Sequence, residues 1–224
     1  MALRHWHWAF GCALVLLVVS IHGSRRPDPS ESAAFARWLV ASGLWGVVST
    51  VSIHLKGVPF GNIVSFSDGP AFNSTGTPYF YLTELDPTAR DLAADDRCSF
   101  TISEASLGTC GKADAESPIC SKITLSGKVW NSPLFDLDGK IYCSLATHSQ
   151  MVKLVSDGEK RFAASALFSK HHEMPNWPKS HNFHFYKLEI LDIFLIDFFG
   201  GPKPLTIEDY YAHVVHKSNG RHYQ

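Results

Sequence analysis

One run of apolar and aromatic residues, 181–199, constrains the fold more than any other part of this 224-residue chain. It lacks glycine and proline and is rich in Phe, Ile, Leu and Tyr, which favour β-strands. Alternation places these apolar residues on one face: Tyr186, Leu188, Ile190, Phe194 and Ile196. The opposite face mixes polar and apolar residues: Phe183, Phe185, Lys187, Glu189, Ile193 and Leu195. Because such a strand exceeds the usual length, we expect it to bend near Asp192 and to be covered on parts of both faces, as in a barrel.

Composition and charge exclude several classes of protein. Hydrophobic residues make up 45% of the chain and charged residues 18%, which is typical of a folded globular domain rather than a disordered one. The 20 Lys and Arg residues are balanced by 21 Asp and Glu, so no electrostatic case for nucleic-acid binding exists. Charges within the long apolar run, among them Lys187 and Asp192, argue against a membrane span.

The N-terminus has the pattern of a secretory signal peptide, which we place at residues 1–23. Arg4 supplies the positive start, and an apolar run from Ala9 to Ile21 follows that is too short to cross a bilayer. An uncleaved signal anchor is the alternative. Residues 24–224 are then expected to form a single domain, and the histidines near the start are excluded as a metal site because they leave with the signal.

Export implies an oxidising compartment, so the cysteines of the mature chain are candidates for pairing. Four remain after signal removal, Cys98, Cys110, Cys120 and Cys143, and four cysteines allow three connectivities. Cys110 and Cys120 flank a loop rich in turn residues, and we expect a disulfide there, worth about 3 kcal/mol in the chain-entropy model. Cys98 is interpreted as a buried free thiol because it shares a strand face with Phe100.

Asn73 begins an Asn-Ser-Thr sequon within a loop rich in Gly, Pro and Ser. Such a loop is expected to be exposed, so Asn73 is the predicted glycosylation site of an exported chain. A mature domain of mainly β structure surrounds it, with helices only at the margins. Strands are expected at 45–53, 62–66, 77–83, 97–103, 121–130 and 181–199.

The expected helices lie outside this strand pattern. One is expected to begin at Asp28 as its cap and to end at Gly43, and others are expected at 86–94, at 158–170 and from Thr206 onward. Helices do not alternate with strands, so an antiparallel barrel is favoured over a parallel sheet.

Five sequence blocks, in fixed order, resemble one known family. They are WGVVSTVSIHLKGVPFGNIVSFSDG (45–69), PYFYLT (78–83), SPICSKITLSGKV (117–129), ALFSKHHEMPNWPKSHNFHFYKL (166–188) and DFFGGPKPLTIEDYY (197–211). Together they resemble the CREG, or cellular repressor, family of secreted glycoproteins. The resemblance implies an FMN-binding split-barrel-like antiparallel β-barrel that assembles as a homodimer.

The same resemblance implies a function and a place of action. Family members occur outside cells and in the endosomal–lysosomal system, and they are linked to growth restraint, differentiation and lysosomal function. A cell-surface or lysosomal sorting receptor is therefore a possible partner. Family members are not known as flavin enzymes, because the groove that holds flavin in the related pyridoxamine-phosphate oxidases is occluded; an FMN-dependent oxidoreductase remains the alternative.

The chain departs from the family pattern in two places. An insertion at about 130–150, which includes Cys143, is expected to form an extended loop or an added hairpin. Sequons familiar from mammalian members have no counterpart here, so Asn73 is the expected substitute and a mannose-6-phosphate route to lysosomes has less support.

No residues are assigned to catalysis, to a cofactor or to a metal. The lysines that could hold an FMN phosphate are scattered and lack a partnering arginine: Lys56, Lys122, Lys128 and Lys187. His181 and His184 would point to opposite faces of a strand, and neither a nucleophile elbow nor an activated thiol is evident.

Exposed aromatic residues are the remaining interaction candidates. Trp177 lies in a loop between two prolines, where packing onto the barrel end is the alternative to a role in binding. Phe183 and Phe185, on the mixed face of the long strand, are the candidates for dimer contact.

Overall fold

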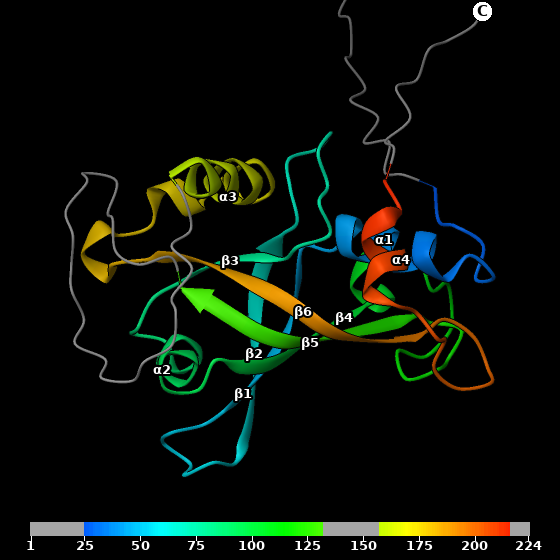
Figure 1. Ribbon diagram of the computed structural model, residues 1–224, viewed down its shortest axis with the longest axis horizontal. Coiled ribbons are helices and arrows are strands. Elements are labelled where there is room, and N and C mark those ends of the chain that lie inside the picture. Colours follow the sequence, from blue (N-terminus) through cyan, green and yellow to red (C-terminus); the bar gives the residue numbers. More distant parts are fainter. Residues whose placement is uncertain (1–24, 132–156, 216–224) are drawn as a thin grey trace, which may run out of the picture.

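Six antiparallel strands form a closed barrel in the order β1-β2-β3-β6-β5-β4 (Figure 1). The computed structural model describes residues 25–131 and 157–215. The strands are β1 (Trp45–Val51), β2 (Pro59–Ser67), β3 (Tyr79–Leu82), β4 (Arg97–Ser103), β5 (Lys122–Asn131) and β6 (His184–Ile196). Every strand pair is antiparallel, which confirms the predicted mainly β barrel.

The helices cover the margins of the barrel, as Figure 1 shows. They are α1 (Ser32–Ser42), α2 (Pro87–Ala94), α3 (Asp157–Lys170) and α4 (Ile207–Ala212), with short 3-10 turns η1 (Glu104–Leu107), η2 (Met174–Asn176) and η3 (Lys179–His181). Helices α1 and α4 pack together at one end, while α3 lies against β3 at the other. Thr206 caps α4 by accepting a hydrogen bond from the Asp209 amide, as predicted.

The first helix begins later than the sequence predicts. Asp28 does not cap it: the Asp28 carboxylate accepts a hydrogen bond from the Ser30 backbone amide at 2.8 Å and another from the Ser30 hydroxyl. These local bonds hold a turn outside the helix, which is how Asp and Ser compete with helical hydrogen bonding. Helix α1 runs from Ser32 to Ser42, and Gly43 is its C-cap, so the predicted end of the helix is confirmed.

A β-bulge in β6 reverses part of the predicted face assignment. Ser126 pairs with Asp192 but Gly127 pairs with Ile190, so Leu191 is an extra residue. Beyond the bulge, Ile193 and Leu195 point into the core: they are buried, whereas the side chain of Phe194 is 44% exposed. The predicted assignment of Phe194 and Ile196 to the inner face is therefore wrong, because one inserted residue shifts a period-two pattern to the other face. The expected bend near Asp192 is confirmed.

Aromatic rings fill the centre of the barrel. Phe66 and Phe80 both pack edge-on against Phe100, with ring centroids 4.9 Å and 5.0 Å away. All three rings are fully buried. Cys98, on the same face of β4, is a buried free thiol, in agreement with the sequence prediction. These buried rings form part of the close-packed core of the barrel.

One disulfide and one buried ion pair stabilise the end of the barrel near β4. Cys110 and Cys120 form the predicted disulfide, with their Cα atoms 5.0 Å apart. The fully buried Glu104 carboxylate accepts hydrogen bonds from the Arg26 guanidinium at 2.6 Å and from the Ser121 amide at 3.1 Å. Burial of Glu104 would raise the pKa of its carboxyl, but these donors outweigh it and the pKa is lowered.

Several predictions fall outside the described residues. These are the signal peptide at 1–23, Cys143 and the insertion at about 130–150 apart from its first two residues, which end β5. Within residues 25–131 and 157–215, none of the helices combines the length and apolarity that crossing a membrane requires.

Candidate functional site

A hollow lined by aromatic rings lies beside the barrel, between β2, the end of β3 and the segment 174–183. Its volume is about 430 Å³. It is lined by Ile63, Val64, Ser65, Tyr81, Leu82, Thr83, Asp86, Met174, Trp177 and Phe183. We call this hollow the aromatic pocket. A mostly apolar hollow with a few polar groups is the usual form of a small-molecule site.

The walls of the aromatic pocket are built by stacking. Tyr81 lies near parallel to Phe183, with centroids 5.0 Å apart, and to Trp177, with centroids 6.0 Å apart. Trp177 and Phe183 are themselves 4.9 Å apart. Phe185 and Phe168 pack behind Tyr81, at 4.9 Å and 5.5 Å. The stacked rings brace one another, so the wall is preformed.

The structure therefore brings together the three residues that the sequence singled out. Trp177, Phe183 and Phe185 are each half-buried, and the ring of each contacts Tyr81. The Trp177 ring packs on Tyr81, in line with the alternative of packing onto the barrel; it also lines the hollow, and its role in binding stays a prediction. Dimer contact through Phe183 and Phe185 stays a prediction, with less free ring surface than the sequence suggested.

Tyr81 is the pocket residue that sequence reasoning missed. It precedes Leu82 at the end of β3 and follows Phe80, which faces the core. Alternation along PYFYLT was the available signal, because it places Tyr81 on the outer face of a barrel strand. Burial raises the pKa of the Tyr81 phenol, so the ring is neutral at physiological pH.

One carboxylate, that of Asp86, is part of the pocket lining. Asp86 caps α2, and its carboxylate accepts hydrogen bonds from the Thr88 amide at 2.7 Å and from the Asn62 side-chain amide at 3.1 Å. Both donors are neutral, and among the described residues Asp86 forms no ion pair within 4 Å. The pocket is consequently an aromatic wall beside a negative charge.

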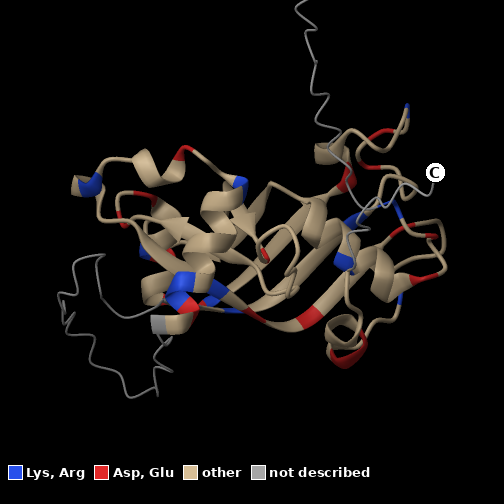
Figure 2. Ribbon diagram, turned by 90° about the horizontal axis from the view of Figure 1, so that it is seen from above, with Lys and Arg blue, Asp and Glu red and all other residues tan. Residues whose placement is uncertain are grey.

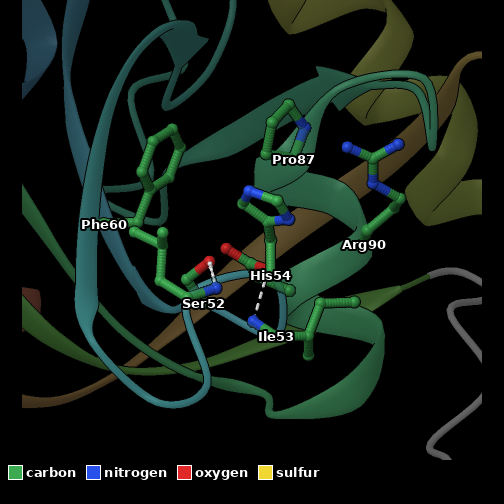
Figure 3. Close-up of a pocket in the computed structure, with 8 residues that line it drawn as sticks. Ser52, Ile53, His54, Phe60, Pro87 and Arg90 are labelled. Carbon is green, nitrogen blue, oxygen red and sulfur yellow. Dashed lines mark hydrogen bonds between the residues drawn. The ribbon is translucent and has the colours of Figure 1, made fainter.

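A second hollow, of about 620 Å³, lies between the tip of the β1–β2 hairpin and α2 (Figure 3). The His54 ring lies between Phe60, Pro87 and Arg90 in this view. On its floor, buried Asp91 accepts hydrogen bonds from the Thr50 hydroxyl at 2.8 Å and the Ile53 amide at 3.0 Å. Asp91 thus fastens the hairpin to α2, and Arg90 gives this hollow a cationic side chain that the described lining of the aromatic pocket lacks.

A third, smaller hollow of about 250 Å³ lies between α3 and β6. Two of its lining residues, Lys187 and Glu159, form an ion pair at 2.6 Å. Tyr79 also lines it, and burial, aided by the nearby Glu159 charge, raises the pKa of the Tyr79 phenol. The lysine is therefore already neutralised by a carboxylate of the same chain.

These hollows do not fit a flavin phosphate, which needs several converging cationic or hydroxyl donors. Lys187 is paired with Glu159, Lys128 lies 3.7 Å from Asp96, and the Lys122 ammonium donates to the Glu116 carbonyl. Lys56 lies in the exposed hairpin turn. The N-terminus of α2 would suit an anion, but the carboxylate of Asp86 already occupies it.

The histidines suggested by the sequence are dispersed. His171 is bonded through Nε2 to the Phe66 carbonyl at 2.9 Å, and burial lowers its pKa. His184 begins β6, whereas His181 ends η3. Across residues 25–131 and 157–215, no three His, Cys, Asp or Glu side chains gather in a way that could hold a metal ion.

Asn73 is exposed in a loop that is held by hydrogen bonds to buried side chains. Buried Asp68 accepts hydrogen bonds from the Ser74 hydroxyl and from the Gly76 amide. Arg37, only 2% exposed, donates to the Ser74 carbonyl at 2.9 Å. The predicted glycan site thus projects from a rigid support, while glycosylation itself stays a prediction. Figure 2 shows Lys and Arg positions interspersed with Asp and Glu positions along the ribbon.

Known proteins of similar sequence match this chain over most of its length. A family profile described as "CREG, beta-barrel" matches residues 27–212. Chicken protein CREG1 (Gallus gallus) is 35% identical over 209 residues, covering 91% of this chain and 96% of that protein. Human protein CREG2 (Homo sapiens) is 36% identical over 199 residues, covering 87% of this chain and 61% of the relative.

Solved structures agree on the fold. A heme binding protein from Mycobacterium smegmatis superimposes with a TM-score of 0.58 at 19% identity, over 84% of this chain and 62% of the other. The protein Atu2129, of unknown function, from Agrobacterium tumefaciens gives a TM-score of 0.56 at 17% identity, over 84% and 63%. At such low identity the likeness establishes the split-barrel fold alone.

Proposed function

The chain belongs to the CREG family, and from that premise we propose that it is a non-catalytic glycoprotein that acts by binding a partner. Its place of action is outside the cell or in the endosomal–lysosomal lumen, and its effect is on growth and differentiation or on lysosomal function. The observation that carries the proposal is the aromatic pocket, which offers preformed recognition surface in a protein whose hollows lack the anchors of a flavin phosphate.

Features of the sequence and structure support export. The Cys110–Cys120 disulfide is of the kind that persists in oxidising compartments. Asn73 is exposed, as an acceptor of N-linked glycan must be. The predicted signal peptide at 1–23 supplies the route. Partners are then lumenal or extracellular: a second copy of the chain, and a cell-surface or lysosomal sorting receptor.

The competing function is an FMN-dependent oxidoreductase. Its test is the visible spectrum of the protein purified from the medium of expressing cells, before and after incubation with excess FMN and gel filtration. We expect no flavin band in either sample. Stoichiometric yellow protein would overturn the proposal. A heme arm is included because one fold relative is titled a heme binding protein, and no Soret band is expected.

A growth assay tests the binding role itself. Purified protein added to cultured cells should slow proliferation, and the variant Trp177→Ala should lose this effect while retaining its thermal unfolding transition. The matched control is Phe194→Ala, which removes an exposed ring on the far side of the β6 bulge and should retain the effect. If added protein has no effect but a lysosome-targeted form does, the protein is instead a lysosomal scaffold.

A further inference from the structure

We propose that the aromatic pocket binds a small organic cation, an alkylated ammonium group of the choline class. Trp177, Tyr81 and Phe183 would form the aromatic wall, and Asp86 would supply the opposing charge. The inference rests on the proposed binding function and names its ligand class. It follows from the aromatic wall and from the charges of the described lining residues, among which Asp86 is the one charged side chain.

The aromatic wall fits a cation because of its electron distribution. The face of an indole or phenol ring is electronegative and attracts an ammonium group within about 6 Å of its centroid. Tyr81 lies nearly parallel to Trp177 and to Phe183, at interplanar angles of 22° and 23°, so the rings share one orientation. Stacking covers part of each face, and the half-buried rings offer a cation the part that remains. Because the rings are fixed by their neighbours, binding requires little ordering of side chains.

The carboxylate of Asp86 gives the aromatic pocket a negative charge. Among the described residues of the lining, Asp86 alone is charged, and its described hydrogen-bond donors, Asn62 and the Thr88 amide, are neutral. A carboxylate has about four acceptor positions, so capacity remains for a ligand. Glu84 and Glu173 are exposed, and each is next in sequence to a lining residue, so both add negative charge near the pocket. Lys179, on the loop 174–183, is exposed and is not among the lining residues.

The other hollows make poorer cation sites. In the hairpin hollow Arg90 would repel a cation, and the carboxylate of buried Asp91 already accepts hydrogen bonds from Thr50 and Ile53. In the hollow between α3 and β6, Glu159 is already paired with Lys187, and the aromatic lining consists of Tyr79 and Tyr211. Of the three hollows, the aromatic pocket therefore offers an ammonium ligand the largest aromatic wall.

Three isosteric probes test the assignment on the full mature protein. Choline, its neutral isostere 3,3-dimethylbutan-1-ol and the anion 3,3-dimethylbutyrate differ chiefly in charge. NMR titration should show choline binding at least about tenfold more tightly than the alcohol and the butyrate not at all, as expected for a ligand held by rings and one carboxylate. Equal affinity for choline and the alcohol would overturn the proposal.

Variants locate the binding site. Asp86→Asn keeps a good helix cap but removes the charge, so the protein should fold normally and lose the preference for choline over the alcohol. Asp192→Asn, at an exposed position of β6, is the control and should bind choline as the unmodified chain does. Trp177→Leu should weaken choline about fivefold or more with little change in thermal unfolding. Unchanged choline binding in both pocket variants would overturn the proposal.

Phosphatidylcholine vesicles distinguish a lipid headgroup from a free amine. Co-sedimentation that Asp86→Asn abolishes identifies the headgroup as the source, and binding of free choline without co-sedimentation identifies a soluble cation. Neither result depends on the flavin spectrum or the growth assay. A growth-active, colourless protein that ignores choline would therefore reject the ligand class and leave the proposed function standing.

Discussion

Two aromatic clusters, one inside the barrel and one beside it, are built from neighbouring residues of the same strand. Phe80 points inward to Phe100 with its ring edge-on and fully buried. Tyr81, the next residue, points outward and stacks face to face with Phe183 and Trp177 at the rim of a hollow. The inner rings have no surface left to offer a ligand, whereas the outer rings keep part of theirs.

The difference shows how one sequence pattern serves two purposes. Inside, close packing of rings contributes apolar burial to stability. Outside, the same residue types pack against the loop 174–183 and against Phe168 of α3, yet the rings remain partly accessible and lie beside Asp86. We therefore expect substitutions in the inner cluster to lower the free energy of unfolding, and substitutions in the outer cluster to weaken binding.

The largest expected effect comes from matched ring deletions. Phe100→Ala should lower the free energy of unfolding by about 3–5 kcal/mol, because it leaves a cavity in a closed core. Phe183→Ala, at a half-buried position, should cost roughly 1 kcal/mol. Chemical denaturation of both variants measures the difference. Equal losses would show that the outer cluster is as much a part of the core as the inner one.

A smaller loss of stability is expected from Gly127→Ala, which probes the bulge that sets which β6 residues face the core. A Cβ atom at Gly127 would lie 1.9 Å from the Glu189 carbonyl oxygen, so the β5–β6 pairing must shift. We expect a loss of about 1–3 kcal/mol in the same denaturation assay. Gly57→Ala is the control: Gly57 has a positive φ, so alanine is strained there, but no atom lies within 4 Å of the added Cβ. A Gly127 variant as stable as the parent chain would contradict the bulge.

A gain in stability is expected from Asp197→Asn, at the opposite end of β6 from the aromatic pocket. Asp197 is buried, and neither of its carboxylate oxygens accepts a hydrogen bond from another described residue. Burial raises the pKa of this carboxyl above its ordinary 3.8, although Lys203 and Arg26 oppose the change. A raised folded-state pKa means that the native state binds the proton more tightly, so this group favours folding in acid and costs stability at neutral pH.

Asp197→Asn should therefore stabilise the protein by about 1 kcal/mol at pH 7, with the gain shrinking as the pH falls towards the ordinary pKa of the carboxyl. Thermal unfolding across that pH range measures it. A variant less stable than the parent at neutral pH would mean that the ion pair with Lys203, at 3.9 Å, dominates instead.

The last prediction concerns the chemical reactivity of the Cys98 thiol and involves no change in stability. Burial, with a lesser contribution from the charge of Asp96, raises the pKa of the Cys98 thiol to about 12. The native protein should therefore resist alkylation at this position at pH 8 and react only on unfolding. Mass spectrometry after iodoacetamide treatment, in a Cys143→Ser background, checks this. Rapid native labelling of Cys98 would show that the inner cluster opens far more readily than its packing implies.

Much of the barrel could be predicted from local patterns. Alternation and β-propensity identified every strand, and the strand at Arg97–Ser103 was predicted to the residue. The short loop between Cys110 and Cys120, rich in turn residues, indicated the disulfide. These features depend on neighbours in the chain, so residue order determines them.

Other features depended on contacts between distant segments. Nothing in the run 181–199 marks Leu191 as an extra residue; the bulge arises from pairing with Gly127 on β5. Arg37 is buried in α1 because Ser74 and Tyr210, far away in sequence, supply acceptors for its guanidinium.

The sequence by itself determined an antiparallel barrel of the CREG family and named Trp177, Phe183 and Phe185 as aromatic candidates. Only the tertiary structure placed these rings against Tyr81 and brought Asp86 into the lining of the same hollow. The physical reason is that periodicity specifies which face of a strand a side chain occupies, whereas the contacts on that face depend on how the chain closes.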